Sequence, residues 1–251
     1  MVAQTKLANW CFQVVAVLAF WMAASGSLAA KDIADDPVDG EIVTVGAKYL
    51  FAPVGFDDND VATVVIDGFL PSGCYRLVQP EVEVDHDSKQ IIVTPKARFY
   101  DHPCIEVLVP FWQEIHLGIL SVGDYKISVP ASSIHEAMHV AEAPSAGPDD
   151  YLYAAIDAAE VDRPLDSDSF VIKMQGRFTN SCMVLSDIRV IDTGRTINVL
   201  PIMTMEDRND CHAVEVPFRR MVNLPISVSE GRHLLHVRSL NGQAVNHVFT
   251  K

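Results

Sequence analysis

Apolar and polar residues alternate along many short segments of the chain after residue 40. This period of two is typical of strands that bury one face. It predicts strands at residues 63–66, 81–84, 90–94 and 125–129, and a second series at 170–174, 188–191, 196–200 and 233–237. Turn-forming clusters such as Pro71-Ser72-Gly73 and Asp192-Thr193-Gly194 lie between them. Short strands at such spacing predict an all-β, antiparallel sandwich architecture.

The strand series occurs twice because the sequence repeats itself. Gly68 and Cys74 match Gly176 and Cys182, and the offset between matching landmarks stays at 107 or 108 up to Gly123 and Gly231. We also match Tyr49-Leu50-Phe51 with Tyr151-Leu152-Tyr153. Such self-similarity indicates a duplication. It predicts two tandem β-sandwich domains, residues 41–130 and 148–251, joined by a linker of residues 131–147 that could form a helix.

One further strand is predicted in each copy. The segment after Cys104 reads Ile105-Glu106-Val107-Leu108-Val109-Pro110-Phe111, and the segment after Cys211 reads His212-Ala213-Val214-Glu215-Val216-Pro217-Phe218. Both share a Val-x-Val-x-Phe face, which predicts a half-buried strand. Pro110 and Pro217 fall on the opposite face and indicate a sheet edge or a bulge.

Four cysteines follow the N-terminal region, and four cysteines allow three pairings. The repeat selects Cys74 with Cys104 and Cys182 with Cys211, one disulfide in each domain. Each bridge closes a loop of about 30 residues, which stabilises a domain by about 3–4 kcal/mol through the entropy of the unfolded chain.

The N-terminal residues predict export. Lys6 precedes an apolar run from residue 7 to 24, and small residues follow it, with Ser27 and Ala29 placed for cleavage by a signal peptidase. We interpret residues 1–30 as a signal peptide and residues 31–40 as an acidic arm; an uncleaved membrane anchor is the alternative. Disulfides agree with a periplasmic or extracellular location.

Charge restricts the partners. Residues 1–30 contain one lysine and no acidic residue, so their removal changes the formal net charge from −14 to −15. Such an acidic chain repels nucleic acid. No later segment is long and apolar enough for a transmembrane helix, so we expect no membrane insertion after cleavage.

The two-domain pattern resembles the immunoglobulin-like β-sandwich modules of exported bacterial proteins, over most of residues 41–251. Antibody domains place a tryptophan between their paired cysteines, and no tryptophan lies midway between either pair here. The resemblance therefore implies a fold and no functional residues.

The linker contains His135-Glu136-Ala137-Met138-His139, an H-E-x-x-H sequence. On a helix the two histidines could share a Zn²⁺, with Glu136 as general base and Glu160 as third ligand. A zinc-dependent hydrolase is therefore one alternative. We favour a chance occurrence, with no metal and no cofactor, because the two domains leave no residues for a peptidase fold.

Two other features are candidates for binding. Asp57-Asp58-Asn59-Asp60 and Asp166-Ser167-Asp168 could hold Ca²⁺, although solvated acidic loops are our preferred interpretation. Trp112 has Arg219 at its matching position, so it is a candidate partner contact or, alternatively, part of a glycan-binding module. The sequence thus favours a non-enzymatic binding or assembly module that acts through a protein partner or through self-assembly.

Overall fold

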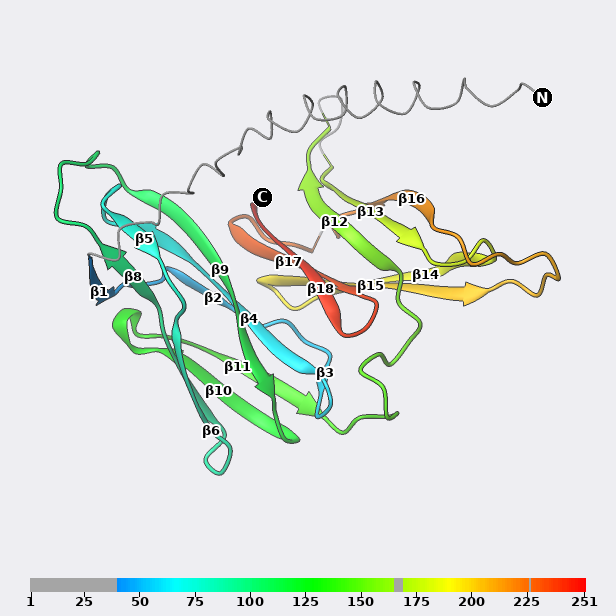
Figure 1. Ribbon diagram of the computed structural model, residues 1–251, viewed down its shortest axis with the longest axis horizontal. Coiled ribbons are helices and arrows are strands. Elements are labelled where there is room, and N and C mark those ends of the chain that lie inside the picture. The colour runs from blue at the N-terminus through cyan, green and yellow to red at the C-terminus, as the bar shows by residue number, and fades with distance from the viewer. Residues whose placement is uncertain (1–39, 165–168, 226) are drawn as a thin grey trace, which may run out of the picture. The chain divides into compact units, whose positions relative to one another are not determined.

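The computed structural model describes residues 40–164, 169–225 and 227–251. The predicted signal peptide, almost all of the acidic arm, and Asp166-Ser167-Asp168 lie outside these residues. The regular secondary structure of the described residues is β-strand apart from one turn of 3₁₀ helix, η1 (Pro130–Ser132). Figure 1 shows the arrangement of the strands. None of its helical structure has the length and apolar character needed to cross a membrane.

Domain 1 consists of three hydrogen-bonded sheets. Its strands are β1 (Glu41–Thr44), β2 (Tyr49–Phe51), β3 (Phe56–Asp57), β4 (Val61–Leu70), β5 (Tyr75–Leu77), β6 (Glu81–Asp85), β7 (Gln90–Thr94), β8 (Lys96–Phe99), β9 (Val109–Ile119), β10 (Gly123–Val129) and β11 (Ile134–Ala141). The sheet orders are β2-β4-β9, β3-β11-β10-β7-β6 and β1-β8-β5. Buried side chains from β4, β9, β7 and β10 form its core between the first two sheets.

Domain 2 repeats the central part of this arrangement. Its strands are β12 (Ala155–Asp162), β13 (Val171–Phe178), β14 (Met183–Asp192), β15 (Thr196–Met205), β16 (Val216–Asn223), β17 (Arg232–Ser239) and β18 (Gln243–Thr250). They form two sheets in the orders β12-β13-β16 and β14-β15-β17-β18. Most strand pairs are antiparallel. The parallel pairs are β7–β10 and β3–β11 in the larger sheet of domain 1 and β15–β17 in the larger sheet of domain 2.

The shared strand order confirms the two tandem β-sandwich domains that the duplication predicts. Gly68 faces Phe111 across β4–β9, and Gly176 faces Phe218 across β13–β16. A Cβ on Gly176 would lie 2.1 Å from the carbonyl oxygen of Ala155, so this landmark glycine is required by close strand packing. The disulfides are Cys74–Cys104 and Cys182–Cys211, as predicted.

Each of the eight predicted strand segments lies wholly or mainly within an observed strand, but three other expectations need correction. The strand that follows Cys104 begins only at Val109, and the strand that follows Cys211 begins only at Val216; Ile105 and Val107 lie in an exposed loop. The possible helix within residues 131–147 is instead β11, which pairs along its length with β10. Domain 1 therefore extends to Ala141, and the connection between the domains is shorter than predicted.

The third correction concerns the first strand of each copy. Val45 donates its N–H to Pro95, and Ala154 donates its N–H to Pro201, so Val45 corresponds to Ala154. Likewise, Tyr49 faces Asp67 as Ala158 faces Gln175. The structural counterpart of Tyr49 is thus Ala158, and Tyr151 belongs to an earlier position of the repeat.

Candidate functional site

The H-E-x-x-H segment is not a metal-binding helix, because it lies in β11. Successive side chains of a strand point to opposite faces, so His135 and His139 share the exposed face while Glu136 points the other way. Four residues along a strand separate the histidines by about 13 Å. His139 Nδ1 lies 2.7 Å from Oδ1 of Asp124 on the neighbouring strand. The segment therefore lacks the geometry on which the zinc-hydrolase alternative depends.

Glu160, the proposed third ligand, lies in domain 2. It faces Lys173 across β12–β13, in a surface hollow that Arg219, Arg220 and Met221 also line. Across residues 40–164, 169–225 and 227–251, no group of three His, Cys, Asp or Glu side chains is placed to hold one metal ion. The structure does not bring Glu160 together with His135 and His139.

The two domains meet through the outer faces of two sheets. Phe51 and Val65 from β2 and β4 form one buried cluster with Leu234 and Val248 from β17 and β18. At its margins Arg232 contacts Asp67 at 2.7 Å, and Asn246 Nδ2 donates to Glu114 Oε2 at 2.7 Å. We call this contact the interdomain interface. It fixes which faces of the domains remain available to partners.

The acidic loop proposed for Ca²⁺ also belongs to this interface. Asp60 accepts hydrogen bonds from the guanidinium of Arg238, at 3.1 and 3.0 Å. Asp58 accepts the N–H of Ala143, and Asn59 donates to the carbonyl groups of Ser145 and Gly147. Burial raises the pKa of Asp60, against the opposing effect of Arg238. The loop thus binds an arginine of domain 2 and the interdomain connection.

The duplication explains why the histidines of β11 are solvated. Gly123 corresponds to Gly231, so β10–β11 of domain 1 corresponds to β17–β18 of domain 2. His135 and His139 then occupy the positions of Asn246 and Thr250. In domain 2 the outer face of β17–β18 packs on domain 1. The corresponding outer face of β10–β11 in domain 1 faces solvent and carries polar side chains. Neither histidine needs a catalytic role to account for its exposure.

Exposed apolar side chains gather at one end of the β4–β9 ladder and in the disulfide loop beside it. We call them the domain 1 apolar patch: Phe69, Ile105, Val107, Leu108 and Trp112. Trp112 is 47 % exposed, Leu108 67 % and Ile105 71 %. The loop of residues 100–108 leads directly into β9, as the ribbon in Figure 1 shows. Phe69 faces Pro110 and Trp112 faces Asp67, so both aromatic side chains stand on the outer face of the sheet.

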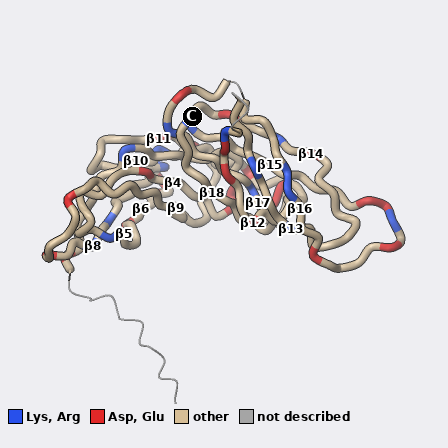
Figure 2. The backbone as a smooth tube through the Cα atoms, turned by 90° about the horizontal axis from the view of Figure 1, so that it is seen from above, with Lys and Arg blue, Asp and Glu red and all other residues tan. Residues whose placement is uncertain are grey.

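The matching surface of domain 2 is charged. Arg177, which faces Pro217, takes the place of Phe69, and Arg219 takes the place of Trp112. Glu215 takes the place of Leu108, and it contacts Arg177 at 3.0 Å. Charged positions accordingly mark β13 and β16 in the tube of Figure 2. The sandwich therefore folds with charges at these positions, and the fold does not require the domain 1 apolar patch.

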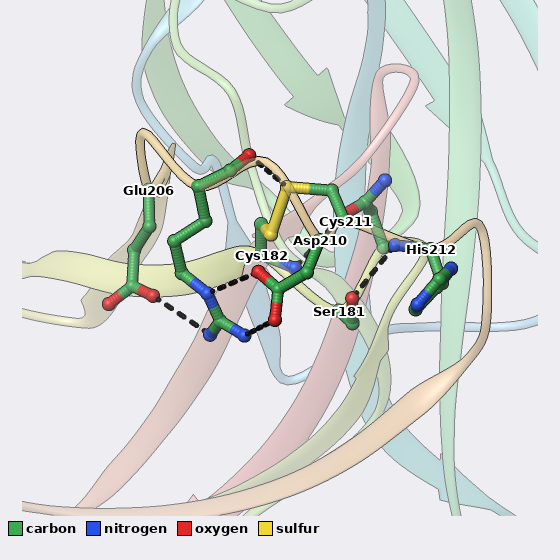
Figure 3. Close-up of a disulfide and its surroundings, with 8 residues drawn as sticks. Ser181, Cys182, Glu206, Asp210, Cys211 and His212 are labelled. Carbon is green, nitrogen blue, oxygen red and sulfur yellow. Dashed lines mark hydrogen bonds and ion pairs between the residues drawn. A yellow bond between two sulfur atoms is a disulfide. The ribbon is translucent and has the colours of Figure 1, made fainter.

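The disulfide loops differ in the same way. In domain 2, Arg208 contacts both Asp210, at 2.9 Å, and Glu206, at 3.4 Å, around the Cys182–Cys211 bridge (Figure 3). Ser181 accepts the N–H of His212, the counterpart of Ile105. The corresponding loop of domain 1 presents Ile105, Val107 and Leu108 to solvent. Sequence analysis identified Trp112 but missed Phe69 and Leu108, although the repeat already aligns Leu108 with Glu215.

Both β9 and β16 are edge strands, as their prolines indicate. In the described residues β9 pairs only with β4, and β16 only with β13. β16 carries Arg219 and Arg220 in sequence, and charged side chains on an edge oppose pairing with another strand. The matching residues of β9 are Trp112 and Gln113. Domain 1 thus exposes an uncharged stretch of strand edge next to its apolar patch.

Comparison with known proteins agrees with the fold. Residues 64–136 match the family model described as the ORF11 beta-sandwich domain. The match runs from β4 to the first residues of β11 and therefore lies within domain 1. No curated protein and no solved structure matches the chain.

Proposed function

We propose that this protein is a non-enzymatic binding or assembly module that acts through protein–protein contacts. The observation that supports the proposal is the difference between the two copies of one fold. Phe69, Leu108 and Trp112 of the domain 1 apolar patch have Arg177, Glu215 and Arg219 as their counterparts in domain 2, and Arg177 and Glu215 form an ion pair. Val107 has an exposed apolar counterpart, Val214. An exposed apolar patch that the fold does not require is typical of an interaction site.

The proposed place of action is the periplasm or the outside of the cell. Two disulfides are typical of proteins that fold in an oxidising compartment. The apolar run and the small residues of the N-terminal sequence add the signal that export would use. A test is the N-terminal sequence of the protein recovered from its native cell: removal of residues up to 29 or 30 is expected.

The surroundings of Trp112 favour a protein ligand over a glycan. Glycan recognition needs polar groups that bond the sugar hydroxyls beside the aromatic ring. The side chains that share the patch with Trp112 are Phe69, Ile105, Val107 and Leu108, which offer no such groups. A retained interaction with purified polysaccharide that is lost in Trp112→Ala would instead support the glycan-binding alternative.

The experiment that tests the proposal is a crosslinking pull-down from the native envelope, analysed by mass spectrometry. Wild type is compared with Phe69→Arg/Leu108→Glu, which places the ion pair of Arg177 and Glu215 into domain 1. Because domain 2 folds with that pair, the variant is expected to keep its melting temperature while losing the captured protein. The control is Arg219→Ala/Arg220→Ala, which alters the matching strand of domain 2 and should retain the captured protein. If wild type, Phe69→Arg/Leu108→Glu and the control variant capture equal amounts of the protein, the domain 1 apolar patch is not its binding site.

A further inference from the structure

We propose that the occupant of the β9 edge is a second copy of this chain, so that two β9 strands pair antiparallel across a two-fold axis. This inference rests on the proposed function, because it uses the same surface and names the partner. The pairing would join two three-stranded sheets into one continuous sheet in the order β2-β4-β9-β9-β4-β2. Strand addition at an exposed edge is a common mode of protein recognition.

The charges along the strand edges favour β9. Edge strand β6 carries Glu81, Glu83 and Asp85, edge strand β14 carries Asp187 and Arg189, and edge strand β16 carries Arg219 and Arg220. The one acidic residue of β9 is Glu114, and its carboxylate accepts a hydrogen bond from Asn246 of domain 2. Since that carboxylate is held against the interdomain interface, it is turned away from an added strand. Edge strand β12 carries Asp157, Glu160 and Asp162, and edge strand β18, which carries no Asp, Glu, Lys or Arg, lies against β12. Among the long edges of the described sheets, that of β9 is therefore the one that is both free of outward-directed charge and not packed against a strand of the opposite sheet.

The prolines indicate which backbone groups are available. A proline in an edge strand lies with its nitrogen toward the open side, because it cannot donate to the neighbouring strand. Pro110 faces Phe69 in β4, so Pro110, Trp112 and Glu114 direct their backbone groups to the open side. The N–H groups of Trp112 and Glu114 can then donate to a partner strand. Phe111, Gln113 and Ile115 direct theirs toward β4.

A single open edge of this kind favours a closed dimer. When each copy offers one edge, the edge of one copy can pair only with the same edge of the other, and such an isologous contact ends at two copies. The chain has a formal net charge of −14, so two copies repel each other except where the contact surface is neutral. The domain 1 apolar patch and the β9 edge supply such a surface. Because salt screens the residual repulsion, the dimer should tighten as salt is raised.

The test is sedimentation equilibrium of the intact, oxidised protein over about a hundredfold range of concentration. Wild type is compared with Trp112→Arg, which copies Arg219 into β9 at an exposed position, and with Arg219→Gln in domain 2. We expect wild type and Arg219→Gln to be dimers. In Trp112→Arg, dissociation should be at least about tenfold more favourable, which corresponds to about 1.4 kcal/mol. Hydrogen exchange should show protection of the Trp112 and Glu114 amides that rises with protein concentration.

A monomer throughout that range would overturn the second-copy proposal, as would a dimer that Trp112→Arg leaves intact or one that dissociates when salt is added. The pull-down separates these outcomes from a failure of the proposed function. A monomer that captures a different protein through Phe69 and Leu108 would leave the binding function standing while removing this partner.

Discussion

Arg238 of domain 2 donates hydrogen bonds from one guanidinium nitrogen to both carboxylate oxygens of Asp60 in domain 1, at 3.1 and 3.0 Å. Their side chains are 3 % and 1 % exposed, so the pair is nearly removed from water. The guanidinium of Arg238 also lies over the rings of Phe56 and Tyr153, 5.7 Å from each centroid. Burial raises the pKa of Tyr153 to about 12, which keeps its hydroxyl neutral beside the carboxylates of this region. A buried ion pair that is flanked by two aromatic rings therefore anchors the interdomain interface.

Removing one member of this pair should be costly. Asp60→Ala leaves the charge of Arg238 buried without its partner, which destabilises a protein by about 3–5 kcal/mol. Replacing both residues, as in Asp60→Leu/Arg238→Met, should recover most of the loss because neither charge is then buried. Urea unfolding measures both changes. The control is Arg177→Ala, whose ion pairs with Asp157 and Glu215 are at the surface, so its free energy of unfolding should stay close to that of wild type.

The stability of the same interface should depend on the protonation of His236. Its side chain is fully buried, with Nδ1 2.8 Å from Oδ1 of Asn246, Phe56 against its ring and Arg238 on the same strand. Burial lowers the pKa of His236 to about 4, with Asn246 opposing and Arg238 adding to the effect. At pH values between about 4, the pKa of His236 in the folded protein, and 6.5, its pKa in the unfolded chain, the unfolded chain binds a proton at His236 that the folded protein does not bind. The free energy of unfolding should therefore fall as pH falls through this window, by about 3 kcal/mol.

Titrating the unfolding free energy from pH 7 to pH 4 checks this expectation. The comparison is His236→Gln, which can still bond Asn246 but takes up no proton. Its profile should lack the contribution of His236 while keeping that of His247, whose pKa burial also lowers. Identical slopes in wild type and His236→Gln would show that His236 stays solvated in the folded protein.

The duplication made much of each domain predictable. Matching landmarks such as Gly68 and Gly176 fixed the register of the copies, and the register then selected both disulfides. The interdomain interface was not predicted, because a period of two identifies the face of a strand that packs in its own domain. It does not show that the opposite face packs on a second domain. A signal was present in Val64-Val65-Ile66, a continuous apolar run that indicates a strand buried on both faces. Leu234-Leu235 in β17 carries the same signal.

The error in β11 has a different cause. Histidines four residues apart lie on one face of a helix and also on one face of a strand, so their spacing does not distinguish the two. Ile134, Met138 and Val140 share the inward parity of a strand, and Met138 and Val140 are fully buried. This alternation of inward and outward positions predicts the strand correctly, whereas the spacing of the histidines does not distinguish a strand from a helix. The patch was only partly predicted because the exposure of Ile105 depends on where β9 begins, which the alternation did not show.

Each disulfide should stabilise its own domain to a similar extent, because the sequence separations are 30 and 29 residues. Loops of this length correspond to about 3–4 kcal/mol in unfolded-chain entropy. We expect Cys74→Ser/Cys104→Ser and Cys182→Ser/Cys211→Ser to lower the free energy of unfolding by about that amount each. Denaturant unfolding of the two variants measures it. Peptide mapping of the wild-type protein provides the control, and a cysteine linked across domains would contradict the assignment.

Zinc measurements on the β11 histidines test the distinction between a binding module and a hydrolase. Because His135 and His139 are about 13 Å apart along a strand, they should not hold one ion together. We expect the zinc content of the purified, oxidised protein to be unchanged by His135→Ala, and peptide cleavage to be absent with or without Glu136→Ala. His139→Ala is a structural control: it removes the exposed contact with Asp124 and should change stability by less than about 1 kcal/mol. About one tightly bound zinc per chain that disappears in His135→Ala, together with cleavage that requires Glu136, would contradict the strand geometry and support the hydrolase.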